Sequence, residues 1–135
     1  MGKEQKSLNR ILADIGESIV AYELQKQGWQ AMLNLGGIGF DIFAKKRDVI
    51  RRIEIKSIDP EQKAGKYRKH LRQSISPAER RDCDFVVVYV HGDSKFFVIP
   101  IEKIPTNNII AMYKRRDGSI SSQYAEFESA WLLLE

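Results

Sequence analysis

Apolar residues recur at three- and four-residue spacing in the first part of the chain. Between Leu8 and Gln27 they form one stripe, which predicts an amphipathic helix: Leu8, Ile11, Leu12, Ile15, Ile19 and Tyr22. Gly28 is placed to end this helix as a C-terminal cap. Gly16 is unfavourable inside a helix on propensity alone, so we expect it to lie where the helix packs closely against a sheet.

The residues after this helix have the patterns of strands. Residues 29–35 predict a short first strand, and a glycine-rich turn at 36–39 leads into a second strand. Residues 49–58, with the sequence VIRRIEIKSI, alternate between apolar and polar side chains and predict a third strand. Arg47 and Asp48 would form the tight turn that joins the second strand to the third.

The second half of the chain predicts further helices and strands. Residues 76–79 (SPAE) carry an N-cap serine, a proline at the first helical position and a glutamate two residues later, which start a short helix. Residues 83–90 form a continuous apolar run, typical of a central strand buried on both faces, and residues 95–100 would pair with it. A further strand near 108–115 and a helix over 121–134 complete the chain. The order predicts an α/β fold, a mixed central sheet flanked by helices.

Composition favours a soluble globular protein, with 43% hydrophobic and 30% charged residues among 135. We expect residues 1–135 to form a single domain. No apolar run reaches the ~20 residues that span a bilayer, and the first residues lack the apolar core of a signal peptide. The single cysteine, Cys83, precedes a buried strand and predicts a reduced thiol. These features predict a cytoplasmic protein with no membrane partner.

Basic residues are concentrated in one segment. Residues 60–81 contain seven Lys or Arg and two Glu, although the net charge of the whole chain is only +4. Tyr67, Leu71 and Ile75 recur there at helical spacing. The segment predicts either a solvated helix face or a surface that contacts DNA phosphates without reading sequence. The residues predicted to bind DNA are Lys63, Lys66, Arg68, Lys69, Arg72 and Gln73.

Charged residues on the second and third strands are predicted to lie on the same face of the sheet. In an antiparallel hairpin with a two-residue turn at 47–48, Asp41 lies opposite Glu54, and Lys56 lies two residues farther along the same face. Two directly opposed carboxylates repel each other, and a hard divalent cation would remove that conflict. The backbone carbonyl of Ile55 could supply another oxygen ligand. Lys56 would then orient or help deprotonate the water that attacks a phosphodiester.

Asp41, twelve intervening residues and then Glu54-Ile55-Lys56 resemble the PD-(D/E)XK nuclease superfamily, which includes restriction endonucleases and Holliday-junction resolvases. Glu17 on the first helix looks like the extra acidic residue that many members use at the metal site. Phe40 stands where the motif has its proline.

The resemblance implies a restriction-endonuclease-like core with the order α-β-β-β-α-β, and hydrolysis of DNA by an Mg²⁺-dependent endonuclease in which Mn²⁺ could substitute. The implied catalytic residues are Asp41, Glu54, Lys56 and Glu17, and the implied metal ligands are Asp41, Glu54, Ile55 and Glu17. Gln73 is similar to a glutamine that some members carry on the helix after the third strand. Symmetric cutting of both strands would require two copies of the site, so a homodimer is expected.

Two other interpretations stay open at this level. Glu54 and Lys56 could be an ion pair on a solvated strand face, worth ~0–1 kcal/mol. The fold could also be a nucleic-acid-binding module that has no turnover, or an interaction protein in which the motif is coincidental. The sequence does not distinguish duplex, single-stranded or branched DNA, and RNA stays possible as a substrate.

Overall fold

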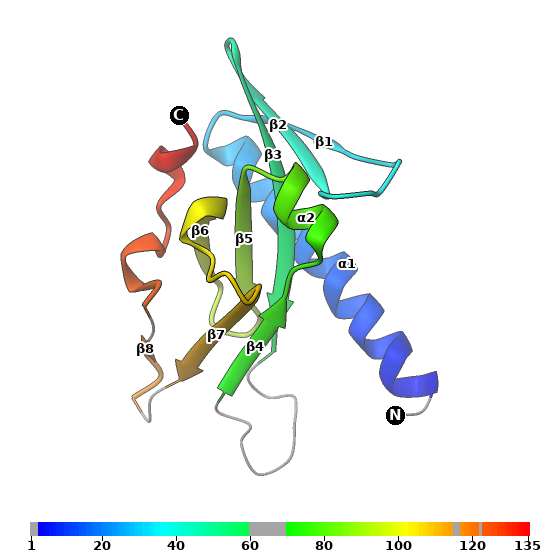
Figure 1. Ribbon diagram of the computed structural model, residues 1–135, viewed down its shortest axis with the longest axis vertical. Helices are drawn as coiled ribbons and strands as arrows, with labels where there is room; N and C mark the ends of the chain where they lie inside the picture. Colours follow the sequence, from blue (N-terminus) through cyan, green and yellow to red (C-terminus); the bar gives the residue numbers. More distant parts are fainter. Residues whose placement is uncertain (1–2, 60–69, 115–116, 122) are drawn as a thin grey trace.

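The computed structural model describes residues 3–59, 70–114, 117–121 and 123–135 (Figure 1). Within these residues no helix is both long enough and apolar enough to cross a membrane. The two α-helices are α1 (Lys3–Lys26) and α2 (Pro77–Asp82). The strands are β1 (Gln30–Leu33), β2 (Ile42–Lys46), β3 (Val49–Ile58), β4 (His70–Ser74), β5 (Phe85–Val90), β6 (Lys95–Pro100), β7 (Ile109–Lys114) and β8 (Ile120–Ser121). Three 3-10 helices are η2 (Ile101–Lys103), η3 (Ala125–Phe127) and η4 (Trp131–Leu134).

A five-stranded mixed sheet is the centre of the fold. Its strand order is β1-β2-β3-β5-β6, in which β3 and β5 are parallel and the other pairs are antiparallel. A second, three-stranded antiparallel sheet has the order β4-β7-β8. The mixed sheet flanked by helices is the α/β fold that the sequence predicted.

Both faces of the five-stranded sheet are buried. All six residues of β5 are buried, and they alternate between two apolar clusters, as expected for a central strand. One cluster joins Val20 and Leu24 of α1 to the sheet. The other joins the opposite face to residues such as Ile110 of β7 and Phe127. The sheet therefore separates α1 on one face from the second sheet on the other.

Two of the predicted helices are different in the structure. Residues 70–74 form the strand β4 and not a helix, and Tyr67 lies outside the described residues. The predicted C-terminal helix is replaced by the short helices η3 and η4, although its apolar residues Tyr124, Phe127, Trp131 and Leu134 are all buried as expected. Burial alone does not distinguish a helix from an irregular segment that buries the same side chains.

The buried face of α1 also differs from the predicted stripe. Ile11, Ile15 and Tyr22 are exposed, whereas Val20 and Leu24 are fully buried. The reason is Gly16, which is buried on the face that meets the sheet. A Cβ atom on Gly16 would overlap Oγ of Ser57 on β3, so only glycine permits this close approach.

We predict that Gly16→Ala destabilises the fold by about 1–3 kcal/mol, because the added methyl group overpacks the contact with Ser57. Helix propensity alone would give the opposite sign, a gain of about 1 kcal/mol. Urea unfolding measures the difference. Adding Ser57→Ala should recover most of the loss by removing Oγ. A Gly16→Ala variant as stable as the wild type would contradict the close approach.

Candidate active site

The β2–β3 hairpin has the register that the sequence predicted. Lys46 pairs with Val49 across the two-residue turn, and Ile42 pairs with Ile53. The pairing ends there, because the N–H of Asp41 also donates to the carbonyl of Ile53, at 2.9 Å, so that Asp41 and Ile42 both lie opposite Ile53. The predicted placement of Asp41 directly opposite Glu54 is therefore wrong, and Asp41 instead reaches β3 through its side chain. β2 begins at Ile42, whereas β3 continues to Ile58, so this end of β3 has an open edge on the β2 side.

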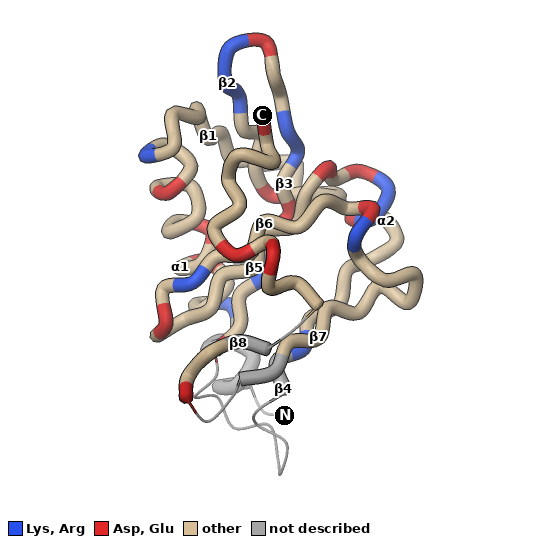
Figure 2. The backbone as a smooth tube through the Cα atoms, turned by 90° about the vertical axis from the view of Figure 1, so that its left-hand side faces the viewer, with Lys and Arg blue, Asp and Glu red and all other residues tan. Residues whose placement is uncertain are grey.

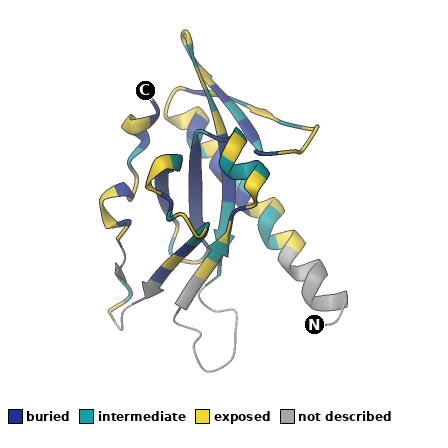
Figure 3. Cartoon of the chain, viewed as in Figure 1, coloured by how far each residue is buried: buried dark blue, intermediate teal, exposed yellow. Residues whose placement is uncertain are grey.

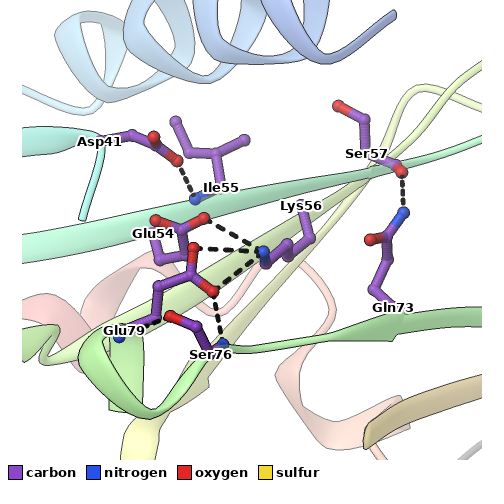
Figure 4. A network of polar contacts seen from close by, with 8 residues as sticks. All are labelled: Asp41, Glu54, Ile55, Lys56, Ser57, Gln73, Ser76 and Glu79. Atoms are coloured by element: carbon purple, nitrogen blue, oxygen red, sulfur yellow. Dashed lines mark hydrogen bonds and ion pairs between the residues drawn. The ribbon is translucent and has the colours of Figure 1, made fainter. Parts of the chain in front are cut away.

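Side chains hydrogen-bond the backbone at this open edge (Figure 4). The N–H of Ile55 donates to Oδ2 of Asp41 at 2.8 Å. Nε2 of Gln73, from β4, donates to the carbonyl of Ser57 at 2.7 Å. The N–H and carbonyl of one strand residue point to the same side. The carbonyl of Ile55 is thus directed toward the edge where Asp41 lies.

Lys56 lies between two carboxylates on the face of β3 that is opposite α1. Its Nζ is 3.3 Å from Oε2 of Glu54, and 3.1 and 3.4 Å from the two carboxylate oxygens of Glu79 (Figure 4). Glu54 is only 5% exposed, and the Lys56 side chain is 16% exposed. Burial by itself would lower the pKa of Lys56, but the charges of Glu54 and Glu79 raise it above its ordinary value. The ammonium therefore keeps its proton.

Glu79 belongs to this cluster although the sequence indicated only its capping role. It is held by the capping box of α2, in which its N–H donates to Oγ of Ser76 at 3.1 Å and the N–H of Ser76 donates to Oε1 of Glu79 at 2.8 Å. The capping box fixes the carboxylate on α2, and the approach of α2 to β3 brings it to Lys56. The SPAE pattern predicts the cap, but no local pattern predicts the contact with Lys56.

Glu17 reaches the same site from α1. Burial, followed by the charge and hydrogen bond of Asp41, raises the pKa of Glu17 to about 7. Burial and then Asp41 also raise the pKa of Glu54 to about 9, and a hydrogen bond to Glu79 adds to this shift. Three carboxyl groups thus crowd around the open edge, and two of them resist ionisation.

A cavity of about 420 Å³ opens at this site. Its lining includes Glu17, Asp41, Glu54, Lys56, Gln73 and His91. The four implied catalytic residues come from α1, from the residue before β2 and from β3, and the fold brings them to one cavity. His91, in the turn after β5, also lines the cavity.

The residues at the open edge fit a divalent cation. Asp41 and the carbonyl of Ile55 face the edge, and the crowded carboxyl groups of Glu17 and Glu54 would be stabilised in ionised form by a positive charge. In the described part of the chain, no three His, Cys, Asp or Glu side chains are already arranged as a metal cluster. Mg²⁺ does not require one, since it keeps several waters and binds through one or two carboxylates.

Most of the residues predicted to bind DNA lie outside the described residues, namely Lys63, Lys66, Arg68 and Lys69. Arg72 is exposed on β4. Gln73 lies on the same strand and not on a helix, and it faces the open edge of β3 through the carbonyl of Ser57.

Comparison with known proteins agrees with this geometry. The family model of the PD-(D/E)XK endonucleases matches residues 8–131. The chain belongs to this family. Membership identifies it as a nuclease. The chain departs from the motif that names the family at Phe40, which stands in place of the proline. Phe40 is buried and contacts Phe43 edge-to-face, with 4.7 Å between ring centroids.

Two solved structures share the family fold. A bacterial homing endonuclease has a TM-score of 0.75 at 20% identity, and the match covers 93% of this chain and 89% of that one. A Holliday junction resolvase from the archaeal hyperthermophile Archaeoglobus fulgidus has a TM-score of 0.55 at 18% identity, covering 76% of this chain and 84% of that one. No curated protein matches the sequence significantly. At these identities the two structures support the restriction-endonuclease-like fold.

We predict that the family's acidic site makes the metal-free protein less stable as the pH rises. Because the pKa of Glu17 is raised from 4.5 to about 7, the native state binds more protons than the unfolded chain between these values. The free energy of unfolding therefore falls as pH rises through this window. Glu17→Gln removes this contribution and keeps a donor toward Asp41. The Tm of the variant minus the Tm of the wild type should therefore increase from about pH 5 to about pH 8.

Thermal unfolding in EDTA measures this difference, with Glu126→Gln as the matched control at an exposed glutamate. The control should differ from the wild type equally at both pH values. A Glu17→Gln effect that is also independent of pH would contradict the raised pKa.

Proposed function

We propose that this nuclease hydrolyses DNA phosphodiester bonds with Mg²⁺ as its cofactor and that Mn²⁺ can replace it. The observation that carries the proposal is the open edge of β3, where Asp41 accepts from the N–H of Ile55 beside Lys56 and its two carboxylates. Asp41, Glu54 and the carbonyl of Ile55 would hold the metal, and Glu17 would assist. Bound there, the cation would neutralise charge on the phosphodiester and make a water more acidic.

The role proposed for Lys56 follows from its charge. Its raised pKa makes it a poor general base at neutral pH, so of the two roles expected from the sequence, orienting the attacking water is favoured over deprotonating it. Its ammonium would donate hydrogen bonds to the water or to a phosphate oxygen, and would stabilise the negative charge that develops there.

Glu79 is proposed as a positioning residue. When Glu54 is engaged by a cation, its charge is no longer available to Lys56, and the cation repels the ammonium. Glu79 then supplies the carboxylate that keeps Lys56 in place. Burial opposes its ionisation, but the N–H of Ser76, Glu54 and Lys56 together lower the pKa of Glu79, so it carries the required charge.

Substrate contacts outside the cavity are proposed for the basic segment, through Lys63, Lys66, Arg68, Lys69 and Arg72. These side chains would follow the phosphate backbone, while Gln73 supports the edge beside the cut. The homodimer, the cytoplasmic or nucleoid-associated location and the preference for duplex, single-stranded or branched DNA stay predictions, and RNA stays possible as a substrate.

We predict that Lys56→Ala keeps the fold and the rise in Tm with Mg²⁺, because the carboxylates remain, but loses turnover by a factor on the order of 10² or more. Asp41→Asn should lose both the metal response and turnover. Cleavage of duplex, single-stranded and branched DNA in Mg²⁺, in Mn²⁺ and in EDTA measures activity, and thermal unfolding measures metal binding. If wild type and Lys56→Ala bind DNA alike and neither cuts any substrate, the chain is a catalytically silent nucleic-acid-binding module.

Glu79→Gln and Ser76→Ala are a matched pair of variants. They separate the capping of α2 from the charge that Glu79 presents to Lys56. Glu79→Gln keeps the capping box, since glutamine also serves at this position, but removes the charge that faces Lys56. We predict that it lowers kcat on the order of 10–100-fold with little change in KM or Tm, the scale of a residue that orients a catalytic group.

Ser76→Ala should do the reverse. It removes the cap at a cost of about 0.5–2 kcal/mol but leaves the charge of Glu79, so Tm should fall while kcat measured well below Tm stays close to that of the wild type. Equal kcat values for Glu79→Gln and wild type would show that Glu79 acts only as a cap.

A further inference from the structure

Two aliphatic side chains project from the loop that precedes the proposed metal ligand Asp41. Leu35 is 91% exposed and Ile38 is 72% exposed. Much of the loop between β1 and β2 is coloured as exposed in Figure 3. Exposed apolar side chains are common one by one, but two on one short loop before a proposed metal ligand, called the patch below, need an explanation.

The loop is held in one conformation. The N–H of Asn34 donates to the carbonyl of Asp41 at 2.8 Å, and its side-chain Nδ2 donates to the carbonyl of Phe40 at 3.1 Å. The N–H of Gly37 donates back to the carbonyl of Asn34 at 3.0 Å. Gly39 has a positive φ of 87° and lies so close to Asp82 that a Cβ atom would overlap its side chain. The loop therefore presents Leu35 and Ile38 to solvent from a fixed base.

The position of the loop limits what can contact it. Asp41 is the third residue after Ile38, so at most about 11 Å of extended chain joins the two. Successive phosphates on one DNA strand advance about 3.4 Å along the helix axis. A phosphodiester bound at Asp41 therefore places its neighbouring bases within about three steps of the loop.

The chemistry of the loop is unsuited to phosphates. No charged residue occurs between Met32 and Phe40, whereas the tip of the neighbouring β2–β3 hairpin carries Lys and Arg (Figure 2). Phosphate contacts would fall to the hairpin and the basic segment. The exposed side chains Leu35 and Ile38 suit an apolar surface, which a duplex offers in the faces of its bases.

The size of the patch argues against an interface between two copies. Leu35 and Ile38 together offer on the order of 200 Å² of apolar surface. A stable protein interface buries about 800 Å² per partner. Adding Met32 and Leu33 does not close this gap.

We propose that Leu35 and Ile38 form an apolar wedge that inserts at a base step of bound duplex DNA beside the scissile phosphate and unstacks it. Leu and Ile serve in this way in proteins that kink DNA, because the contact with the wedge offsets the loss of base stacking. The inference rests on the proposed function, since it requires DNA at Asp41. It adds that this nuclease distorts the duplex where it cuts.

The test compares Leu35→Ser/Ile38→Ser with Leu132→Ser, a matched removal of an 80% exposed leucine from η4. Permanganate reactivity of thymines reports unstacking in bound duplexes, measured with Mg²⁺ in the Lys56→Ala background so that the DNA stays uncut. With the wild-type loop and with Leu132→Ser, permanganate reactivity should be enhanced at thymines within about three base steps of the cut site, which is mapped with active enzyme. The double variant should lose the enhancement and bind on the order of 10-fold more weakly. Its slope of log K against log salt should be unchanged, because no phosphate contact is lost.

Several outcomes would overturn the wedge. Equal permanganate patterns for the double variant and the wild-type loop, with DNA still cut by active enzyme, would refute the wedge and leave the proposed function intact. A reduced salt slope would assign the loop to phosphate contacts. Sedimentation that shows a wild-type dimer and a monomeric double variant, with unaltered permanganate reactivity, would make the patch a contact between copies. Absence of any DNA binding by the wild type would refute the proposed function together with the wedge.

Discussion

The site depends on a mismatch in strand length, since β3 continues to Ile58 whereas its neighbour β2 begins only opposite Ile53. Backbone groups at an edge that is partly buried must find hydrogen-bond partners. Side chains supply them, because Asp41 accepts from the N–H of Ile55 and Gln73 donates to the carbonyl of Ser57. Two backbone groups of the edge are thereby satisfied without a further strand. A carboxylate and a strand carbonyl are left side by side, and the space that a strand would have filled belongs to the cavity.

Electrostatics at this edge oppose stability and favour a ligand. Glu17 and Glu54 both have raised pKa values because burial and the charge of Asp41 act against their ionised forms. A surface ion-pair ladder would not be buried in this way, and it would not place carboxyl groups next to one another. Violations of ordinary packing chemistry are expected at functional sites, where other parts of the fold compensate. Here β5, in which all six residues are buried, and the four buried central residues of β6 provide that compensation away from the cavity.

The sequence predicted those parts of the site that depend on the hairpin register and on the alternation of side chains along β3. The two-residue turn after Lys46 determines the register as far as Ile42 and Ile53, and Asp41, one residue beyond, reaches β3 through its bonds with Ile53 and Ile55. Glu79 could not be found in this way, because its contact with Lys56 depends on how α2 packs against the sheet. The buried face of α1 was missed for a similar reason, since hydrophobicity favours Ile11 and Ile15 but the sheet selects the face where Gly16 permits close approach. β4 lies within the basic segment, where the helical spacing of Leu71 and Ile75 predicted a helix and the structure has a strand.

α2 connects the catalytic cluster to the aliphatic loop. Near its N-terminus Glu79 holds Lys56 at 3.1 Å, and at its C-terminus the side chain of Asp82 lies against Gly39. Arg81 also pairs with Asp82 at 2.8 Å, which fixes that carboxylate beside the loop. A helix of only six residues therefore supports both the ammonium proposed to act at the phosphate and the loop proposed to act on the bases. Because α2 carries both contacts, it would help to hold the ammonium and the loop at a constant distance from each other. A duplex that cannot be deformed at that distance from the cut would fit the cavity or the loop, but not both.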